Sequence, residues 1–364
     1  MSNLTEQAVK ELLESFEHEL LEEDLVKSKS LQTIDIDGEA VSVNIRLGFP
    51  CLGVQDDIKA ELKNTLETSD LISEANVELS WKVSAHKVEV DTAPINGIKN
   101  IIAVASGKGG VGKSTTAVNL ALALKAEGAK VGVLDADIYG PSQPMMLGVK
   151  DEQPVSHDQK TFEPVKAHGM EVMSIGFLVD EDTATIWRGP MVSNALQQLL
   201  GQTNWDNLDY LVIDLPPGTG DIQLTLAQKV PVTAALIVTT PQDIALIDAK
   251  KAVNMFNKVN IPSLGVVENM AMHICSSCGH TEAIFGEGGG DALAEQYGVP
   301  LLGSLPLELN IRQQTDSGNP TVAAEPDGKV AEIYRDIARK LTAKIAIIPK
   351  DYRGDAEPIM FREA

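Results

Sequence analysis

The chain has 364 residues, a formal net charge of −22 and a hydrophobic content of 43%, values typical of a globular protein with room for two domains. It contains no run of about twenty apolar residues, which a membrane-spanning helix requires, and its acidic first segment lacks the basic and then apolar pattern of an export signal. The negative net charge argues against nucleic acid and anionic membranes as partners. The chain has three cysteines, two of them clustered, and this number and arrangement do not suit a disulfide framework. We therefore expect a cytoplasmic protein.

Residues 1–90 have the pattern of a small α/β domain. Apolar residues recur at helical spacing in two segments and alternate with polar residues in two others. The expected elements are a helix over 5–23, a strand over 41–47, a helix over 56–66 and a strand over 77–83. Segment 91–97 follows, and its Pro, Asn and Gly content is typical of a linker.

Residues 98–364 alternate between short, nearly continuous apolar strands and helical patterns. The expected strands cover 101–105, 131–134, 211–213, 235–238, 264–267 and 301–302. Strands without polar alternation are typical of a parallel sheet that helices cover on both faces. We therefore expect a doubly wound, mostly parallel α/β sheet, in which a ligand binds at the carboxyl ends of the strands.

The most informative motif follows the first of these strands. Its residues fit Gly-x4-Gly-Lys-Ser, the phosphate-binding loop of P-loop nucleotide triphosphatases, and a helical pattern over 115–127 comes next. The glycines let successive N–H groups point at phosphates beside the positive end of that helix. The expected nucleotide site is formed by Gly107, Lys108, Gly109, Gly110, Val111, Gly112, Lys113, Ser114 and Thr115. Lys113 is expected to reach the β- and γ-phosphates and Ser114 to bind Mg²⁺, whereas the alternative is a glycine-rich turn that binds nothing.

A second lysine, Lys108, directly follows the first glycine of this loop. The run Lys-Gly-Gly-Val-Gly-Lys-Ser resembles the deviant P-loop class of MinD and ParA proteins. The resemblance implies that Lys108 crosses a dimer interface to the nucleotide of the partner and acts like an arginine finger supplied in trans. The alternative is a solvated loop lysine.

Acidic residues end two of the other expected strands. Asp135 and Asp137 follow the strand at 131–134, and Asp214 follows the strand at 211–213. A strand-end aspartate suits the Mg²⁺ shell, which is the role we expect for Asp214. In the resembled class, the second aspartate of the Asp-x-Asp run orients or deprotonates the attacking water, a role implied for Asp137, while Asp135 supports the metal and the loop. The alternative is that each aspartate only caps the following turn.

Two further features lie at strand ends. The resemblance implies that Asn269, after the strand at 264–267, binds the adenine edge, although asparagine is also a common turn residue. The segment Pro216-Pro217-Gly218 indicates a rigid switch whose backbone senses the γ-phosphate.

The second informative motif is Cys275-x2-Cys278. This spacing lets both sulfurs of a tight turn face one metal, and the remaining cysteine, Cys51, lies in the first domain. An iron–sulfur cluster or an all-thiolate zinc site takes four thiolates, which two chains about a two-fold axis would supply. Three alternatives stay open: a zinc site completed by His273 and His280, which the short spacing would strain, a catalytic dithiol, and a metal-free loop.

Together these motifs resemble the Mrp/ApbC family of P-loop ATPases. Besides the phosphate loop, the matching motifs are 135–142, 214–218, 268–270, the cysteine pair and 285–289, and the resemblance covers 98–309. It implies an ATPase of slow turnover that carries a [4Fe–4S] cluster, bridged across a homodimer, from an assembly scaffold to apo-proteins. The first domain, with Cys51 ahead of a helix, resembles the small iron–sulfur cluster assembly domain often fused to this family.

Two other functions stay open. A MinD/ParA-like partitioning ATPase would need a basic surface for DNA or a C-terminal amphipathic membrane helix, and segment 350–358 predicts neither. A zinc-stapled scaffold would bind ATP without hydrolysing it.

Overall fold

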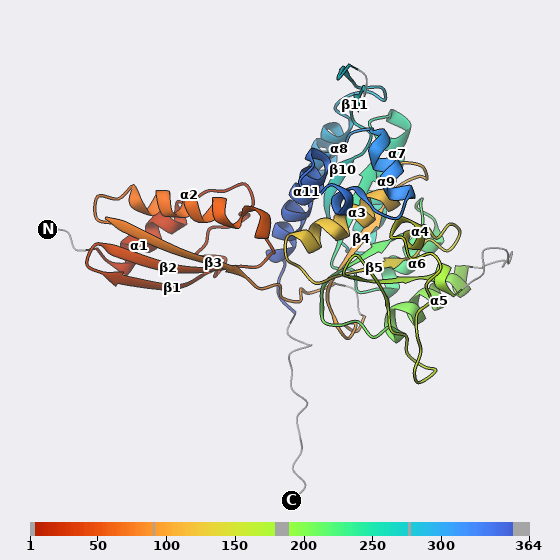
Figure 1. Ribbon diagram of the computed structural model, residues 1–364, viewed down its shortest axis with the longest axis horizontal. Coiled ribbons are helices and arrows are strands. Elements are labelled where there is room, and N and C mark those ends of the chain that lie inside the picture. Colours follow the sequence, from red (N-terminus) through yellow and green to blue (C-terminus); the bar gives the residue numbers. More distant parts are fainter. Residues whose placement is uncertain (1–3, 90–91, 179–188, 276–277, 352–364) are drawn as a thin grey trace, which may run out of the picture.

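The computed structural model describes residues 4–89, 92–178, 189–275 and 278–351 (Figure 1). Parts of two predictions, the linker at 91–97 and the tail at 350–358, therefore lie outside the described residues. The described chain contains a three-stranded sheet within residues 31–81 and an eight-stranded sheet that begins at Ile98. No helix among these residues is both long and apolar enough to cross a membrane.

Two helices pack on one face of the small sheet (Figure 1). The strand order is β1-β2-β3, with β1 antiparallel and β3 parallel to the central β2. The elements are α1 Glu6–Glu14, β1 Leu31–Asp37, β2 Ala40–Leu47, η1 Leu52–Val54, α2 Gln55–Glu67 and β3 Glu74–Trp81. Val41, Val43 and Ile45 alternate along β2 and are buried under the helices, because successive strand residues face opposite sides of a sheet.

The predicted helix over 5–23 is wrong in its length. α1 ends before Ser15, whose hydroxyl donates a hydrogen bond to the carbonyl of Leu12 at 2.8 Å. Such a side-chain bond to the backbone competes with continuation of a helix. Phe16 and Leu20 are nevertheless buried, so their apolar spacing reflects packing of the following turns.

The large sheet has the strand order β13-β10-β9-β4-β8-β5-β7-β6. All neighbouring strands are parallel except the edge pair β6 and β7. Its strands are β4 Ile98–Ala105, β5 Val131–Asp135, β6 Val165–Ala167, β7 Met170–Ser174, β8 Leu208–Asp214, β9 Ala234–Thr239, β10 Ser263–Glu268 and β13 Leu301–Ser304. The predicted doubly wound, mostly parallel sheet is confirmed.

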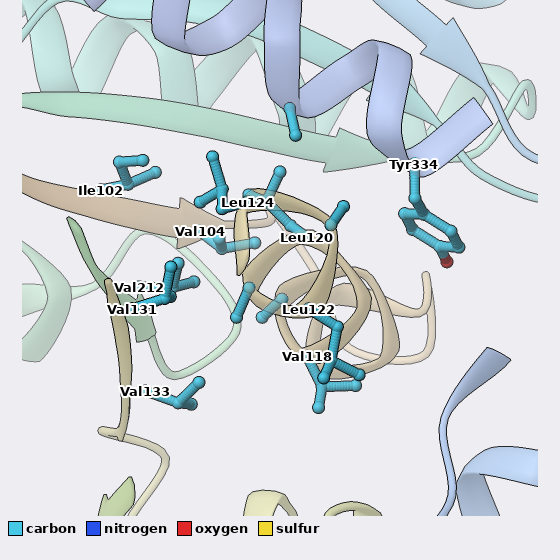
Figure 2. Close-up of a cluster of buried hydrophobic side chains, with 14 of the residues drawn as sticks. Ile102, Val104, Val118, Leu120, Leu122, Leu124, Val131, Val133, Val212 and Tyr334 are labelled. Atoms are coloured by element: carbon cyan, nitrogen blue, oxygen red, sulfur yellow. The ribbon is translucent and has the colours of Figure 1, made fainter. Parts of the chain in front are cut away.

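Helices cover both faces of this sheet and form two separate hydrophobic cores. The helices are α3 Lys113–Ala126, α4 Gln143–Met146, α5 Gly189–Gln202, α6 Asp221–Lys229, α7 Asp243–Lys258, α8 Gly289–Tyr297, α9 Leu309–Asp316, α10 Thr321–Ala324 and α11 Lys329–Ala346. Figure 2 shows part of the first core, where Leu120 and Leu124 of α3 gather beside Val104 of β4, with Tyr334 of α11 at its edge. α3 is buried on nearly all sides because it lies between the sheet and α11, which explains its Ala-rich and Leu-rich sequence.

A buried carboxylate joins the small α/β region to the large sheet. Glu127 caps the carboxyl end of α3 and is fully buried. Its side chain accepts hydrogen bonds from Nε of Arg335 at 2.8 Å, from Nη1 of Arg339 at 2.9 Å and from the N–H of Gly53 at 2.8 Å. A Cβ at position 53 would lie 1.8 Å from Nη2 of Arg335, so a larger residue would displace this guanidinium from its contact with Glu127. The helix that starts at the phosphate loop therefore ends against the small α/β region.

We expect Glu127→Ala to lower the free energy of unfolding by about 3–5 kcal/mol, because it removes the buried carboxylate that pairs with both Arg335 and Arg339 and leaves the N–H of Gly53 without its acceptor. Urea denaturation followed by circular dichroism measures the loss. The matched control is Glu332→Ala, which removes a 55% exposed carboxylate from the same Arg339 and is expected to change the free energy by less than about 1 kcal/mol. Equal losses in the two variants would contradict this interpretation of the junction.

Candidate functional site

The phosphate loop lies between the carboxyl end of β4 and the start of α3, as its motif predicts. Gly110 and Gly112 have φ values of 83° and 82°, in the left-handed region that favours glycine. Gly107 packs against α7, where an added Cβ would lie 2.1 Å from the backbone of Asp248. The loop is therefore held against a neighbouring helix in a conformation that depends on its glycines.

Lys113 points into the protein beside the loop. Its side chain is 6% exposed, and the ammonium forms an ion pair with the fully buried Asp214 at the end of β8. The same ammonium lies 3.3 Å from Oγ of Ser114. The hydroxyl of Ser114 and the carboxylate of Asp214 are oxygen donors of the hard type that Mg²⁺ prefers, so the residues present fit this metal.

Asp135 organises the loop that follows β5. Its carboxylate accepts hydrogen bonds from the N–H groups of Asp137 at 3.1 Å, Ser142 at 2.9 Å and Gln143 at 3.0 Å, and from the hydroxyl of Ser174 at 3.3 Å. These contacts fold residues 137–143 around one side chain. The position of Asp137 therefore depends on Asp135.

Burial changes the acidity of both strand-end carboxyls after β5. It raises the pKa of Asp135 to about 7, and the neighbouring Asp214 carboxylate adds to the shift. Burial also raises the pKa of the half-buried Asp137, with a further rise from Asp214 that the ammonium of Lys113 opposes. A raised pKa makes the Asp137 carboxylate a stronger base, which suits a group that takes a proton from water.

Asn269 lies in the turn that follows β10, and its side chain packs against the phosphate loop. Its side chain is 8% exposed, and Nδ2 donates a hydrogen bond to the carbonyl of Val111 at 2.8 Å. A Cβ at Gly112 would lie 2.1 Å from this Nδ2, so the asparagine packs directly on the loop. The switch segment 216–218 also touches the loop, since the N–H of Gly218 donates to the carbonyl of Ser106 at 2.9 Å.

Lys108 and Gly109 occupy the outer rim of the loop. The carbonyl of Lys108 accepts a hydrogen bond from the Ser106 hydroxyl at 2.8 Å, while its side chain is half-buried. Gly109 is exposed. This rim therefore lies at the surface, whereas Lys113 and Asp214 lie in the interior.

Gln143 is the site residue that sequence reasoning did not identify. It begins α4 and is fully buried, and its Nε2 donates hydrogen bonds to Oδ2 of Asp214 at 2.8 Å and to the carbonyl of Ser114 at 3.0 Å. In the sequence, Gln143 could have been noticed only as a polar residue close after Asp135 and Asp137, directly behind Pro141-Ser142.

The cysteine pair lies on a hairpin formed by β11 His273–Ile274 and β12 Thr281–Glu282. The N–H of Cys275 donates to the carbonyl of His280 at 2.9 Å, and the N–H of Gly279 donates to the carbonyl of Cys275 at 2.8 Å. Cys275 is half-buried and Cys278 is exposed, with no disulfide between them, while the two serines of the motif lie outside the described residues.

The described side chains of this hairpin do not converge on one point within a single chain. In the part of the chain that the structure describes, no three or more His, Cys, Asp or Glu side chains gather as a metal-binding group. This includes His273, Cys275, Cys278 and His280, the ligand set of the intrachain zinc alternative. Nδ1 of His273 instead lies 3.1 Å from the carbonyl of Leu307.

Cys51 is a buried thiol. It lies between β2 and η1 with none of its surface exposed, and burial raises its pKa to about 12, with a further contribution from the Glu127 carboxylate. The thiolate, not the thiol, is the metal ligand. In this conformation Cys51 therefore stays protonated at neutral pH.

Comparison with known proteins agrees with this geometry. Residues 97–342 match the family described as NUBPL iron-transfer P-loop NTPase, and residues 6–79 match the family described as iron-sulfur cluster assembly protein. The iron-sulfur cluster carrier protein of Haemophilus influenzae is 48% identical over 359 residues, which cover 98% of this chain and 95% of the relative. The iron-sulfur cluster carrier protein of Pseudomonas fragi is 61% identical over 278 residues, which cover 76% of this chain and 97% of the relative.

Solved structures give the same fold. The nucleotide-binding protein of Archaeoglobus fulgidus in complex with ADP has 38% identity and a TM-score of 0.56, and the match covers 64% of this chain and 90% of that one. The cell division ATPase MinD of Pyrococcus furiosus has 26% identity and a TM-score of 0.50, covering 66% of this chain and 98% of that one. The resemblance that the motifs predict is confirmed, and the chain belongs to the NUBPL iron-transfer P-loop NTPase family, with an N-terminal segment of the iron-sulfur cluster assembly family.

Proposed function

We propose that this protein is an ATP-hydrolysing carrier that binds a [4Fe–4S] cluster between two copies of the chain and transfers it to apo-proteins. The observation that carries the proposal is the presence, in one α/β unit, of a phosphate loop and an accessible Cys-x2-Cys hairpin (Figure 1). Relatives at up to 61% identity bear the name iron-sulfur cluster carrier protein. We assign residues 1–90 to a small domain, 91–97 to a linker and 98–364 to the ATPase domain.

ATP hydrolysis would use the residues around the loop in distinct roles. The ammonium of Lys113 would neutralise charge on the β- and γ-phosphates, and Ser114 and Asp214 would hold Mg²⁺, which polarises the phosphate oxygens. Asp137 would orient or deprotonate the attacking water, with Asp135 holding its loop in place. These groups act mainly by position and charge, as phosphoryl transfer requires.

Nucleotide binding would depend on the backbone of the same loop. The N–H groups of 107–115 would surround the phosphates at the positive end of α3. Asn269 donates one amide hydrogen to the carbonyl of Val111, and its amide oxygen would accept a hydrogen bond from the adenine amine.

The cluster is the cargo, and its ligands would come from two chains. Each chain offers Cys275 and Cys278, and a [4Fe–4S] cluster takes four thiolates. Exposed apolar side chains lie on α7, on the hairpin and in nearby segments, and a second copy would cover them in the proposed dimer. These side chains are Ile244, Ile247, Met272, Ile274, Ile284 and Leu309. We propose a cytoplasmic homodimer that receives its cluster from an assembly scaffold and has neither nucleic acid nor membrane as a partner.

We expect mixed dimers of Lys108→Ala and Asp137→Ala chains to recover ATP hydrolysis that neither variant shows alone. If Lys108 acts across the interface, one of the two sites in a mixed dimer contains both wild-type groups. Phosphate release is measured for each variant and for an equimolar mixture. A lysine that acts on the nucleotide of its own chain predicts that the mixture never exceeds the mean of the two separate variants.

Metal analysis combined with a phosphate-release assay separates the proposed function from its two alternatives. A cluster carrier binds iron and sulfide after anaerobic reconstitution and hydrolyses ATP. A partitioning ATPase hydrolyses ATP without retaining iron, and a zinc-stapled scaffold retains zinc and releases no phosphate. Either of the last two results would replace the carrier proposal.

A further inference from the structure

The orientation of the Gln143 carboxamide is determined by its neighbours. Both contacts of the side chain, Oδ2 of Asp214 and the carbonyl of Ser114, are hydrogen-bond acceptors. Only the NH2 end of a carboxamide can donate, so this end faces them and each of its two hydrogens has a partner. The amide oxygen therefore points away from both groups.

That amide oxygen is buried and has no hydrogen-bond partner among the described residues. A buried acceptor without a partner is unfavourable by about 1–3 kcal/mol, and such groups are rare in folded proteins. This oxygen belongs to the side chain of Gln143, which donates hydrogen bonds to the Asp214 carboxylate and to the backbone carbonyl of Ser114. The carboxylate of Asp214 and the hydroxyl of Ser114 are the proposed Mg²⁺ ligands. A donor that enters with the ligand of this site would give this oxygen a partner.

We propose that Gln143 is a positioning residue for Mg²⁺, whose amide oxygen accepts a hydrogen bond from a water molecule in the coordination shell of the metal. The inference rests on the proposed binding of Mg-ATP. Mg²⁺ gives up its waters reluctantly and usually keeps several of them, and a metal-bound water is a strong donor that needs acceptors around the site. Groups that hold the outer shell of a metal in this way affect its affinity without touching it.

The backbone of Gln143 extends the effect to the catalytic loop. Its N–H donates to the same Asp135 carboxylate that holds the N–H of Asp137. Metal binding would therefore stabilise, through one residue, both the Asp214 carboxylate and the loop that carries Asp137. Metal-free nucleotide has no water for this oxygen and would bind independently of it.

The test compares nucleotide affinity with and without the metal. A fluorescent ATP analogue is titrated into the full-length protein over a series of Mg²⁺ concentrations and in EDTA. In Gln143→Met, which fills a similar volume without polar atoms, we expect the Mg²⁺ concentration for half-maximal tightening to rise about tenfold. Affinity in EDTA should change less than about twofold, because the substitution removes one hydrogen bond to the Ser114 carbonyl but leaves the N–H groups and glycines of the phosphate loop unchanged. Gln143→Leu serves as a second variant if the first does not fold.

The matched control is Gln314→Met on α9. Gln314 also has a buried amide oxygen without a partner among the described residues, and its Nε2 donates to Glu325 at 2.6 Å. This control should leave the Mg²⁺ dependence unchanged. An unchanged Mg²⁺ dependence in the Gln143 variants, or a parallel loss of affinity in EDTA, would overturn the inference and assign Gln143 a structural role. A wild-type protein that binds no nucleotide, or binds it without regard to Mg²⁺, would overturn the proposed function itself.

Discussion

Lys113→Ala is expected to reduce ATP turnover by at least about 100-fold, because it removes the buried cation that would face the β- and γ-phosphates. Phosphoryl transfer depends on stabilising charge that develops on the phosphate oxygens, and an ammonium in a site of low dielectric contributes strongly to it. Phosphate release with saturating Mg-ATP measures the effect. Unchanged release would remove the assignment of the nucleotide site.

The same substitution leaves the buried Asp214 without its ion-pair partner, so folding must be checked separately. Circular dichroism and the unfolding midpoint of the variant give this check. Lys125→Ala is the matched control, because this exposed lysine lies at the other end of the same helix and should leave turnover unchanged. A loss of activity in both variants would point to damage to α3 rather than to lost charge at the phosphates.

Cys275→Ala or Cys278→Ala is expected to abolish cluster binding, whereas the wild-type dimer should take up about four irons on anaerobic reconstitution. Each substitution removes two of the four thiolates of a bridged cluster, because each dimer carries it twice. Iron and sulfide analysis together with visible absorption measures the content. Cys51→Ala is the control and should retain the cluster, since this thiol is fully buried and its pKa is raised to about 12.

Transfer of the cluster to an apo-protein is the decisive further experiment. Holo-protein mixed with an apo iron–sulfur enzyme should restore the activity of that enzyme, because a cluster held by only two ligands from each chain on an accessible hairpin is labile. Acid should weaken cluster binding, since protons compete for the thiolate ligands. One tightly bound zinc per chain with exclusion of iron would favour the zinc-stapled scaffold instead.

The phosphate-loop motif and the cysteine pair were predictable because each is a local arrangement. The conformation of the phosphate loop depends on glycines within a few residues of one another, and two of them adopt positive φ values. The cysteine turn is closed by Cys275, Gly279 and His280, again within six residues. The apolar strands of the central sheet were predictable for a related reason, since burial on both faces leaves a nearly continuous apolar run.

Strands β1, β6 and β7 and the end of one helix were not predicted. β1 and the pair β6 and β7 lie at sheet edges, where the pairing with distant neighbours decides whether a short segment becomes a strand. The helix predicted over 5–23 ends before Ser15, although Phe16 and Leu20 continue the apolar pattern. Apolar residues at this spacing can also be buried in turns that pack on the core, so the spacing alone did not show where the helix ends.

By itself, the sequence of this protein determined the phosphate loop, the cysteine hairpin and the class of the sheet, because neighbouring residues specify each of them. Only the tertiary structure decided what surrounds the two ends of α3. A carboxylate at the end of a helix is unfavourable next to the helix dipole, yet Glu127 is stabilised there by two arginines 208 and 212 residues further along the chain. At the other end, Gln143 is a single polar residue whose importance becomes visible only when folding brings it between Asp214 and Ser114. Contacts between segments so far apart have no periodicity or spacing in the sequence, so packing alone determines them.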